Sequence, residues 1–296
     1  MTKIGFLACE TTVPSAGERR GDAFEHDLMI SSLAPAFEAA GLDLCVIDWE
    51  APLEAFESIA LVMLGTSWNY QDKPQAFLEK LEALNERGIT VCNPPDIVRW
   101  NAKKTYLRDL ADAGARTIPT LWRENVTAKG ALEAMEVFDT DRIVVKRQIG
   151  AGAMGQELIS RGSMPDADWS FGHPAMLQPF LPAIAEEGEL SFVVIEGELS
   201  HALRKLPANG DYRIQSLYGG TENVHQPSEE EAAAAAAIIA ALPFPAPLYA
   251  RIDMLRAEDG ALMVMEAELI EPYLYPEQGP GLGKRLAGAI ANRMRT

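Results

Sequence analysis

The chain has 296 residues, of which 48% are hydrophobic and 23% charged, and its formal net charge is −17. This length exceeds one average domain, and the apolar content suffices for real cores, so we expect two or three lobes. The negative charge argues against nucleic acid or an anionic membrane as partner, because both need a basic surface. It does not exclude a nucleotide, since a few local lysines and a metal ion can reverse the sign inside a cleft.

The cysteines and histidines show no metal-binding pattern. Cys9, Cys45 and Cys92 are isolated in or beside strand-like runs, so we interpret them as buried thiols in a reducing cytoplasm. The first ten residues contain too short an apolar run for a signal sequence. No stretch approaches the roughly 18 apolar residues of a membrane span, so we expect a cytoplasmic protein.

The first hundred residues alternate between strand and helix patterns, which is typical of a parallel α/β domain. Strands are expected at 4–9, 44–48, 59–64 and 90–92. Helices are expected over 24–40 and 74–87, ended by Gly41 and Gly88. Pro35 is expected to kink or break the first helix.

The remaining residues predict shorter elements and an antiparallel sheet. Helices are expected over 103–113, 228–241 and 282–293, the second headed by a capping box at Ser228. Strands are expected at 143–146, 158–160, 175–180, 190–195, 199–206, 249–255 and 262–270.

Three carboxylates lie on the last two of these strands. Asp253 is in the first, and Glu266 and Glu268 share one face of the second, because alternate residues of a strand point the same way. The Asp259-Gly260 turn folds the strands into a hairpin and brings Asp253 toward the pair. Buried carboxylates are costly unless neutralised, and oxygen ligands in this number suit Mg²⁺, which often also carries nucleotide phosphates.

A glycine-rich loop follows Lys146, with glycines at Gly150, Gly152 and Gly155. Glycines let backbone N–H groups approach a phosphate, and the lysine adds positive charge. Most such loops are only flexible turns, and neither the Walker spacing nor the dinucleotide fingerprint is present. The loop is therefore a weak indication of a phosphate site.

A strand end at Gln178 to Leu181 runs into an acidic turn that reaches Glu189. The pattern fits a solvated loop and an adenine hinge equally well. In the hinge, a carboxylate would bind the ribose hydroxyls.

Three basic residues, Lys205, Arg213 and Arg251, lie in or beside apolar strands ahead of the carboxylates. One such arginine is usually structural, but three fit charge balance around phosphates and an anionic substrate.

The order of these motifs, beginning with Lys104 and ending with the three carboxylates, resembles the ATP-grasp superfamily. Segments 177–184 and 198–205 are similar to glutathione synthetase-like ligases. The layout around Trp68-Asn69-Tyr70 and 100–107 also resembles the ATP-grasp enzymes grouped with the D-cycloserine-forming cyclo-ligase. The resemblance implies a mixed α/β and α+β ATP-grasp fold: an N-terminal parallel α/β domain over 1–99, a central lobe over 100–180, and a C-terminal lobe over 181–296. ATP would be clamped between the last two.

The resemblance also implies a chemistry. The enzyme would be an ATP-dependent carboxylate–amine ligase that forms an amide or a small ring through an acyl phosphate and releases ADP and phosphate. Its partners would be small-molecule carboxylates and amines, and a homo-oligomer would be in keeping with relatives. A small-molecule kinase and a nucleotide-binding protein without turnover remain alternatives.

The resemblance assigns the following roles. The ATP phosphates would be held by Lys104, Lys146, Gly150 and Gly152, the adenine by Gln178, Phe180 and Leu181, and the ribose by Glu189. Two Mg²⁺ ions would be bound by Asp253, Glu266 and Glu268. Catalytic charge stabilisation would come from Arg213, Arg251 and Lys205.

Some positions depart from the family pattern. Lys205 stands where the synthetase has Arg, and Glu268 where the family often has Asn. Gly65 and Asn69 replace an Arg and an Asp that cycloserine-type relatives tend to carry, which indicates a different substrate. Glu271 would lie near the substrate amine or be structural, and surface or helix-face roles are expected for His26 and Asp27.

Overall fold

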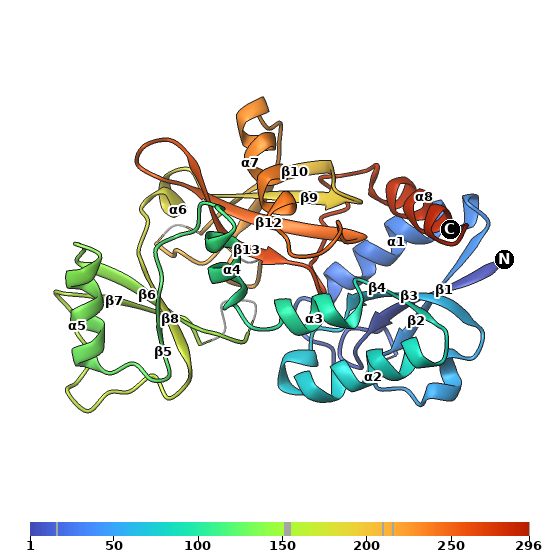
Figure 1. The fold of residues 1–296 in the computed structure, drawn as a ribbon, viewed down its shortest axis with the longest axis horizontal. Helices are drawn as coiled ribbons and strands as arrows, with labels where there is room; N and C mark the ends of the chain where they lie inside the picture. The colour runs from blue at the N-terminus through green and yellow to red at the C-terminus, as the bar shows by residue number, and fades with distance from the viewer. Residues whose placement is uncertain (16, 151–154, 209, 215, 296) are drawn as a thin grey trace.

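The computed structural model describes residues 1–15, 17–150, 155–208, 210–214 and 216–295, and its strands form three sheets. Figure 1 shows the first sheet at one end of the molecule, the antiparallel sheet with the C-terminal hairpin in the middle, and the third sheet at the other end. The architecture is the expected mixture of a parallel α/β part and antiparallel parts.

The first sheet is parallel, in the order β2-β1-β3-β4. Its strands are β1 (Thr2–Ala8), β2 (Leu42–Asp48), β3 (Ile59–Thr66) and β4 (Thr90–Cys92). One face packs on α1 (Ala23–Ala39) and α8 (Leu282–Arg293), and the other on α2 (Pro74–Glu86) and α3 (Pro95–Asn101). Short 3₁₀ turns, η1 (Leu53–Phe56) and η2 (Tyr70–Asp72), follow β2 and β3. Both faces are covered, which is why the central strand β3 is apolar and buried along almost its whole length, whereas the edge strand β2 is only partly buried.

The middle sheet is antiparallel, in the order β11-β10-β9-β12-β13. Its strands are β9 (Glu189–Ile195), β10 (Glu198–Leu206), β11 (Thr221–His225), β12 (Tyr249–Arg256) and β13 (Leu262–Glu268). One face packs on α4 (Tyr106–Asp112) and α7 (Glu229–Ala240), leaving the opposite face for other contacts. The 3₁₀ turn η3 (Ser216–Tyr218) lies in the connection from β10 to β11.

The third sheet has the order β5-β8-β6-β7 and is antiparallel. Its strands are β5 (Leu121–Arg123), β6 (Arg142–Arg147), β7 (Glu157–Ser160) and β8 (Ala175–Pro179). Helix α5 (Ala128–Val137) packs on it through alanine and methionine side chains, and α6 (Ala183–Glu186) follows β8. Helix α5 covers the outer side of this sheet in Figure 1.

Most of the expected elements are confirmed to within a few residues, including the Ser228 capping box. The expected break at Pro35 is wrong, because α1 continues through this residue. Five α-helices and strands were missed: α3, β5, α5, the four-residue α6 and β11. Three of them carry weak signals, since β5 has three residues, β11 is polar and largely exposed, and α5 contains Gly130.

Buried amides tie the carboxylate hairpin to the N-terminal part of the chain. Asn93 Nδ2 donates to the carbonyls of Tyr249 (2.8 Å) and Leu269 (2.6 Å), and Asn101 Nδ2 donates to the carbonyl of Ala267 (2.8 Å). Asn93 has a φ of 57°, a backbone conformation that asparagine tolerates better than most residues. These bonds fix the ends of β12 and β13 in space. The domain boundaries at 99/100 and 180/181 stay a prediction.

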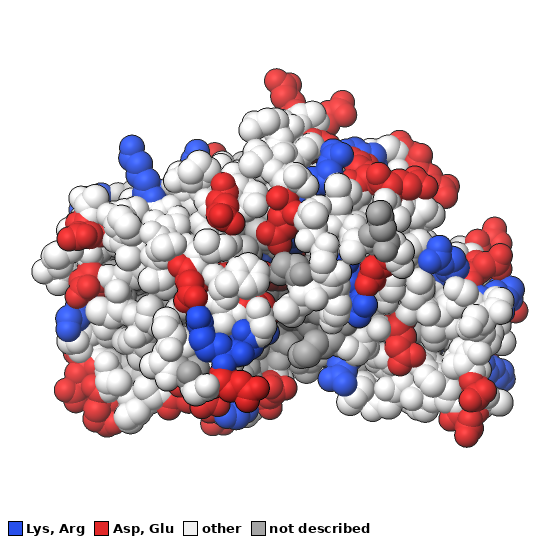
Figure 2. Space-filling view, turned by 180° about the vertical axis from the view of Figure 1, so that it is seen from behind, with Lys and Arg blue, Asp and Glu red and all other residues white. Residues whose placement is uncertain are grey.

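The surface carries the excess of acidic side chains that the net charge of −17 requires. Figure 2 shows acidic side chains spread over the visible face, with basic side chains in smaller groups among them. In the described part of the chain, no helix is both long enough and apolar enough to cross a membrane.

Candidate active site

A cavity of about 340 Å³ lies against the free face of the middle sheet. Every predicted site residue that the structure describes lines it; Gly152 lies outside the described residues. These lining residues are Lys104, Lys146, Gly150, Gln178, Phe180, Leu181, Glu189, Lys205, Arg213, Arg251, Asp253, Glu266 and Glu268. Segments far apart in the sequence thus meet in one place, while the individual roles stay predictions.

Strand register places the charged residues on one face of the middle sheet. Arg251 pairs with Glu268, and Asp253 with Glu266, across β12 and β13. Asp253 also lies opposite Ser191 of β9, and Lys205 of β10 lies opposite Glu189. Directly opposed residues of an antiparallel pair point to the same face, so seven polar side chains project together toward the cavity.

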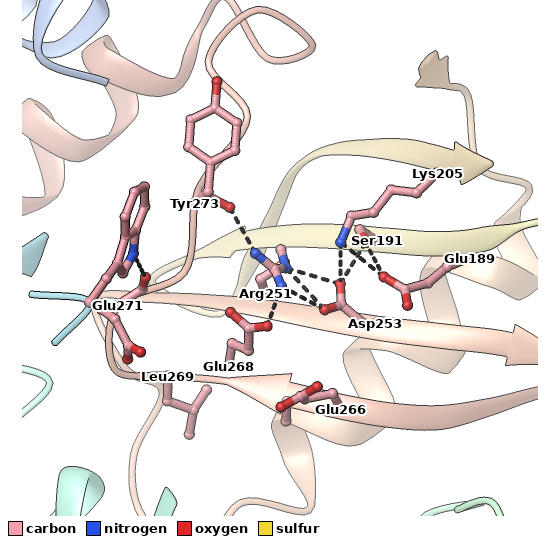
Figure 3. Close-up of polar contacts among 12 residues, drawn as sticks. Glu189, Ser191, Lys205, Arg251, Asp253, Glu266, Glu268, Leu269, Glu271 and Tyr273 are labelled. Carbon is pink, nitrogen blue, oxygen red and sulfur yellow. Dashed lines mark hydrogen bonds and ion pairs between the residues drawn. The ribbon is translucent and has the colours of Figure 1, made fainter. Parts of the chain in front are cut away.

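Asp253 is the centre of a buried ion-pair network (Figure 3). Arg251 donates to its carboxylate from Nε (3.0 Å to each oxygen) and from Nη2 (2.8 Å). Ser191 Oγ donates to Oδ1 at 2.5 Å, and Lys205 Nζ lies 3.5 Å from the same oxygen. Asp253 is 2% exposed and Lys205 3%, so neither charge could be tolerated there without its partners.

The other two carboxylates are also held by cations. Glu268 accepts from Arg251 Nη2, and Glu266 accepts from Lys104 Nζ. Arg251 also donates from Nη1 to the carbonyl of Tyr273 at 3.1 Å, which fixes its guanidinium. Each carboxylate expected to bind metal is therefore paired with a cation expected to bind phosphate or stabilise charge.

These contacts set the ionisation of the network. Burial alone would raise the pKa of Asp253, but Arg251 and Lys205 overcome it and hold the pKa well below its usual range. Burial lowers the pKa of Lys146 to about 8, and the nearby charge of Lys104 adds to the shift. Burial raises the pKa of Glu271 to about 8, and the negative charge of Glu268 adds to it.

The fit of the carboxylates to Mg²⁺ rests on their chemistry and register. As the side chains stand, no three Asp, Glu, His or Cys residues among those described are gathered closely enough to hold a metal ion. The reason is visible in the network, since each carboxylate is turned toward a cation. The donors are nevertheless hard oxygens on one sheet face, and Glu266 and Glu268 are partly exposed to the cavity. The residue types thus suit Mg²⁺ once the cations release them.

An apolar pocket forms one end of the cavity. Phe180 and Leu181 lie there beside a buried cluster comprising Ile118, Ile184, Ile214, Leu255 and Met263, and Met265 also packs against it. Gln178 donates to Thr120 Oγ1 at 3.0 Å, which fixes its side chain at the edge of this pocket. A flat aromatic base is the kind of ligand that such a pocket accommodates. Sequence reasoning missed the isoleucines and Met265, because an apolar residue carries no signal in the sequence that it faces a cavity rather than the core.

Glu189 supplies a buried acceptor next to the ion-pair network. Its Oε1 accepts from Lys205 Nζ at 2.9 Å, whereas its Oε2 has no hydrogen-bond partner among the described residues although it is buried. An unpaired buried carboxylate oxygen is costly, so a hydroxyl donor from a ligand would stabilise it. A ribose hydroxyl has the required chemistry.

Three other residues with unassigned roles are now placed. His26 is buried and its Nδ1 lies 2.7 Å from Thr66 Oγ1, and Asp27 pairs with Arg19 at 2.9 Å, so both have structural contacts. Glu271 lines the cavity, and its Oε1 accepts from Gln71 Nε2 at 3.2 Å.

The segment Trp68-Asn69-Tyr70, which follows β3, lies partly at the cavity and partly in the core. Trp68 lines the cavity and donates from Nε1 to the carbonyl of Glu271 at 2.9 Å. Asn69 contacts Trp49 and Glu50, and Tyr70 is buried.

Comparison with known proteins agrees with this geometry. Residues 166–259 match the family model of the prokaryotic glutathione synthetase ATP-grasp domain, and residues 4–93 match that of the N-terminal domain of D-cycloserine synthetase DcsG. The crystal structure of D-cycloserine synthetase DcsG superposes with a TM-score of 0.80 at 23% identity, covering 99% of both chains. A D-alanine–D-alanine ligase from Bacillus anthracis gives a TM-score of 0.68 at 15% identity, covering 100% of this chain and 97% of that one. The fold is thus that of the ATP-grasp ligases, which use ATP and typically Mg²⁺.

Sequence similarity identifies the family of ATP-grasp ligases to which the chain belongs. The cycloserine biosynthesis protein DcsG of Streptomyces lavendulae is 30% identical over 295 residues, covering 91% of this chain and 95% of that protein. A glutathione synthetase of Prochlorococcus marinus subsp. pastoris is 25% identical, covering 62% of each chain. The chain therefore belongs to the family of ATP-grasp ligases that includes this cycloserine biosynthesis protein.

Proposed function

We propose that this ligase activates a small-molecule carboxylate with ATP and joins it to an amine. One observation carries the proposal: the cavity combines an apolar pocket and two lysines at the nucleotide end with Lys205, Arg251 and three carboxylates on one sheet face. A carboxylate oxygen would attack the γ-phosphorus, and the bond from phosphorus to ADP would break. The amine nitrogen would then attack the acyl carbon, expelling phosphate and losing a proton.

The nucleotide would be placed by residues at one end of the cavity. Lys104, Lys146 and the backbone at Gly150 would hold the phosphates, with Gly152 as a further contact expected from the sequence. The adenine would lie against Phe180 and Leu181 beside Gln178, and Glu189 would accept from the ribose. The buried Oε2 of Glu189 supports the last assignment.

The charged residues of the middle sheet, next to those proposed to hold the nucleotide, would stabilise the transferring group. Arg251 and Lys205 are fixed by buried partners, so their charge is preorganised before substrate arrives. Arg213 would add a third positive charge from the connection between β10 and β11. Two Mg²⁺ ions held by Asp253, Glu266 and Glu268 would neutralise charge on the phosphates.

The proposal is tested by measuring ADP release over pairs of carboxylates and amines in the presence of Mg²⁺. ADP release that requires both components, together with an amide or cyclised product by mass spectrometry, is the expected result. ADP release with the acid alone and a stable phosphorylated product would instead identify a kinase. Cytoplasmic location and homo-oligomer formation stay predictions from the sequence.

A further inference from the structure

Two loops from different parts of the chain meet at the rim of the cavity. One is the segment 17–22 before α1, and the other contains η3 in the connection from β10 to β11. The backbone of Gly21 faces Leu217, because a methyl group added at Gly21 would lie 3.1 Å from Leu217 Cδ2. Leu217 lines the cavity although it is 53% exposed, so this contact is at its edge.

Each loop carries one arginine that lines the cavity and is held in the same way. Arg20 donates to Asp22 from Nε and from Nη2 (3.0 Å), and its guanidinium lies 5.0 Å from the ring centre of Trp68. Arg213 donates to Asp211 from Nε (3.1 Å) and from Nη2 (2.7 Å). Its guanidinium lies 3.7 Å from the ring centre of Tyr218.

The shared arrangement has a physical consequence. The aspartate takes the edge formed by Nε and Nη2, and the aromatic ring covers one face of the guanidinium. The side chain therefore loses much of its rotamer freedom before any ligand binds, while Nη1 is not part of the aspartate pairing. A guanidinium held this way is suited to donate to a planar anion such as a carboxylate.

These arginines are distinct in position from the residues proposed to act on the reacting carboxylate. The side chains of Arg251 and Lys205 are 9% and 4% exposed, whereas those of Arg20 and Arg213 are 31% and 36% exposed. A substrate whose reacting carboxylate is at the buried cations would extend its remaining atoms toward this rim.

We propose that Arg20 and Arg213 form a two-arginine clamp for a second carboxylate of the acid substrate. This inference rests on the proposed ligase function and adds the substrate class, a small dicarboxylic acid. It makes Arg20 a specificity-determining residue, and it gives Arg213 a recognition role besides charge stabilisation. Asp22 and Asp211 are then positioning residues that act through the arginines.

The test compares binding of dicarboxylates with that of monocarboxylates of similar length. Malonate, succinate and glutarate are titrated against acetate, propionate and butyrate by thermal shift, with ADP and Mg²⁺ present and ionic strength fixed. At least one dicarboxylate is expected to bind more tightly than its matched monocarboxylate. Arg20→Met is expected to lower that affinity by about tenfold or more, as loss of a charged hydrogen bond does.

Arg108→Met is the matched control, because Arg108 also lies over an aromatic ring, 4.7 Å from the centre of Trp122, but does not line the cavity. Arg20→Lys retains the charge but lacks the planar guanidinium, so we expect an intermediate loss of dicarboxylate affinity. This variant serves as the test if Arg20→Met folds poorly. Equal binding of mono- and dicarboxylates, or a dicarboxylate preference unaffected by both Arg20 variants, would overturn the clamp.

Failure of the clamp can be told apart from failure of the ligase function. ADP release with a monocarboxylic acid and an amine at a rate that does not depend on Arg20 would refute the clamp and leave the ligase function intact. Tight dicarboxylate binding without ADP release for any amine would support the clamp and count against the ligase function.

Discussion

The cavity-lining face of the middle sheet and the rim of the cavity both carry arginine–aspartate pairs, but in different surroundings. The side chains of Arg251 and Asp253 are 9% and 3% exposed, whereas those of Arg20 and Asp22 are 31% and 14% exposed. A buried charge must keep its partner, because water cannot replace it, while a charge at the rim is partly solvated. The buried pairs therefore contribute to folding as well as to chemistry, and the rim pairs are free to serve recognition.

The strongest test of this contrast is Arg251→Met. The variant leaves Asp253 and Glu268 without their main partner, so we expect a loss of about 3–5 kcal/mol in the free energy of unfolding. Urea denaturation followed by circular dichroism measures it. Arg108→Met, at the surface, should stay within about 0.5 kcal/mol of the unmodified protein. Equal stabilities of the two variants would contradict the view that the network is needed for folding.

The Glu266→Gln variant separates the contribution of Glu266 to turnover from its contribution to folding stability. The Glu266 side chain is 25% exposed and pairs with Lys104, so the free energy of unfolding should change little. Turnover should fall by at least about 100-fold if Glu266 holds a metal ion, because the neutral amide is a poorer ligand. ADP release at saturating ATP and Mg²⁺ measures the effect, with Glu258→Gln in the exposed turn of the same hairpin as control. Near-normal ADP release would remove Glu266 from the metal site.

Lys146→Met should weaken nucleotide binding by about tenfold, which corresponds to roughly 1.4 kcal/mol. Because the pKa of Lys146 in the free protein is about 8, the lysine is charged below this pH and loses its proton above it. Affinity for ATP should therefore fall as pH rises through 8, and this dependence should be absent in Lys146→Met. Calorimetry between pH 6.5 and 9 tests it, with the exposed Lys129→Met as control. The same pH dependence in both variants would show that another group is responsible.

The sequence predicted the parts of this site that depend on local pattern. Alternation placed Glu266 and Glu268 on one face, and the Asp259-Gly260 turn brought β12 beside β13 with Asp253 opposite Glu266. The pairing of Lys104 with Glu266 joins residues 162 positions apart, and no local pattern contains that information. The same holds for Arg20 over Trp68, where an exposed-looking arginine becomes a cavity residue only after two loops have met.

Of these variants, Asp22→Asn at the rim is expected to have the smallest effect. Asp22→Asn removes the charge that holds Arg20, but water can solvate the exposed guanidinium, so the free energy of unfolding should fall by only about 0.2–1 kcal/mol. Released from Asp22, Arg20 should spread over more rotamers, and dicarboxylate affinity should fall although Arg20 itself is present. Urea denaturation and the dicarboxylate titration are measured on the same protein, with Asp27→Asn as a control, because Asp27 pairs with Arg19 and does not line the cavity. A stability loss as large as that of Arg251→Met would show that the rim pair is a folding element like the buried one, and the contrast between the two regions would be lost.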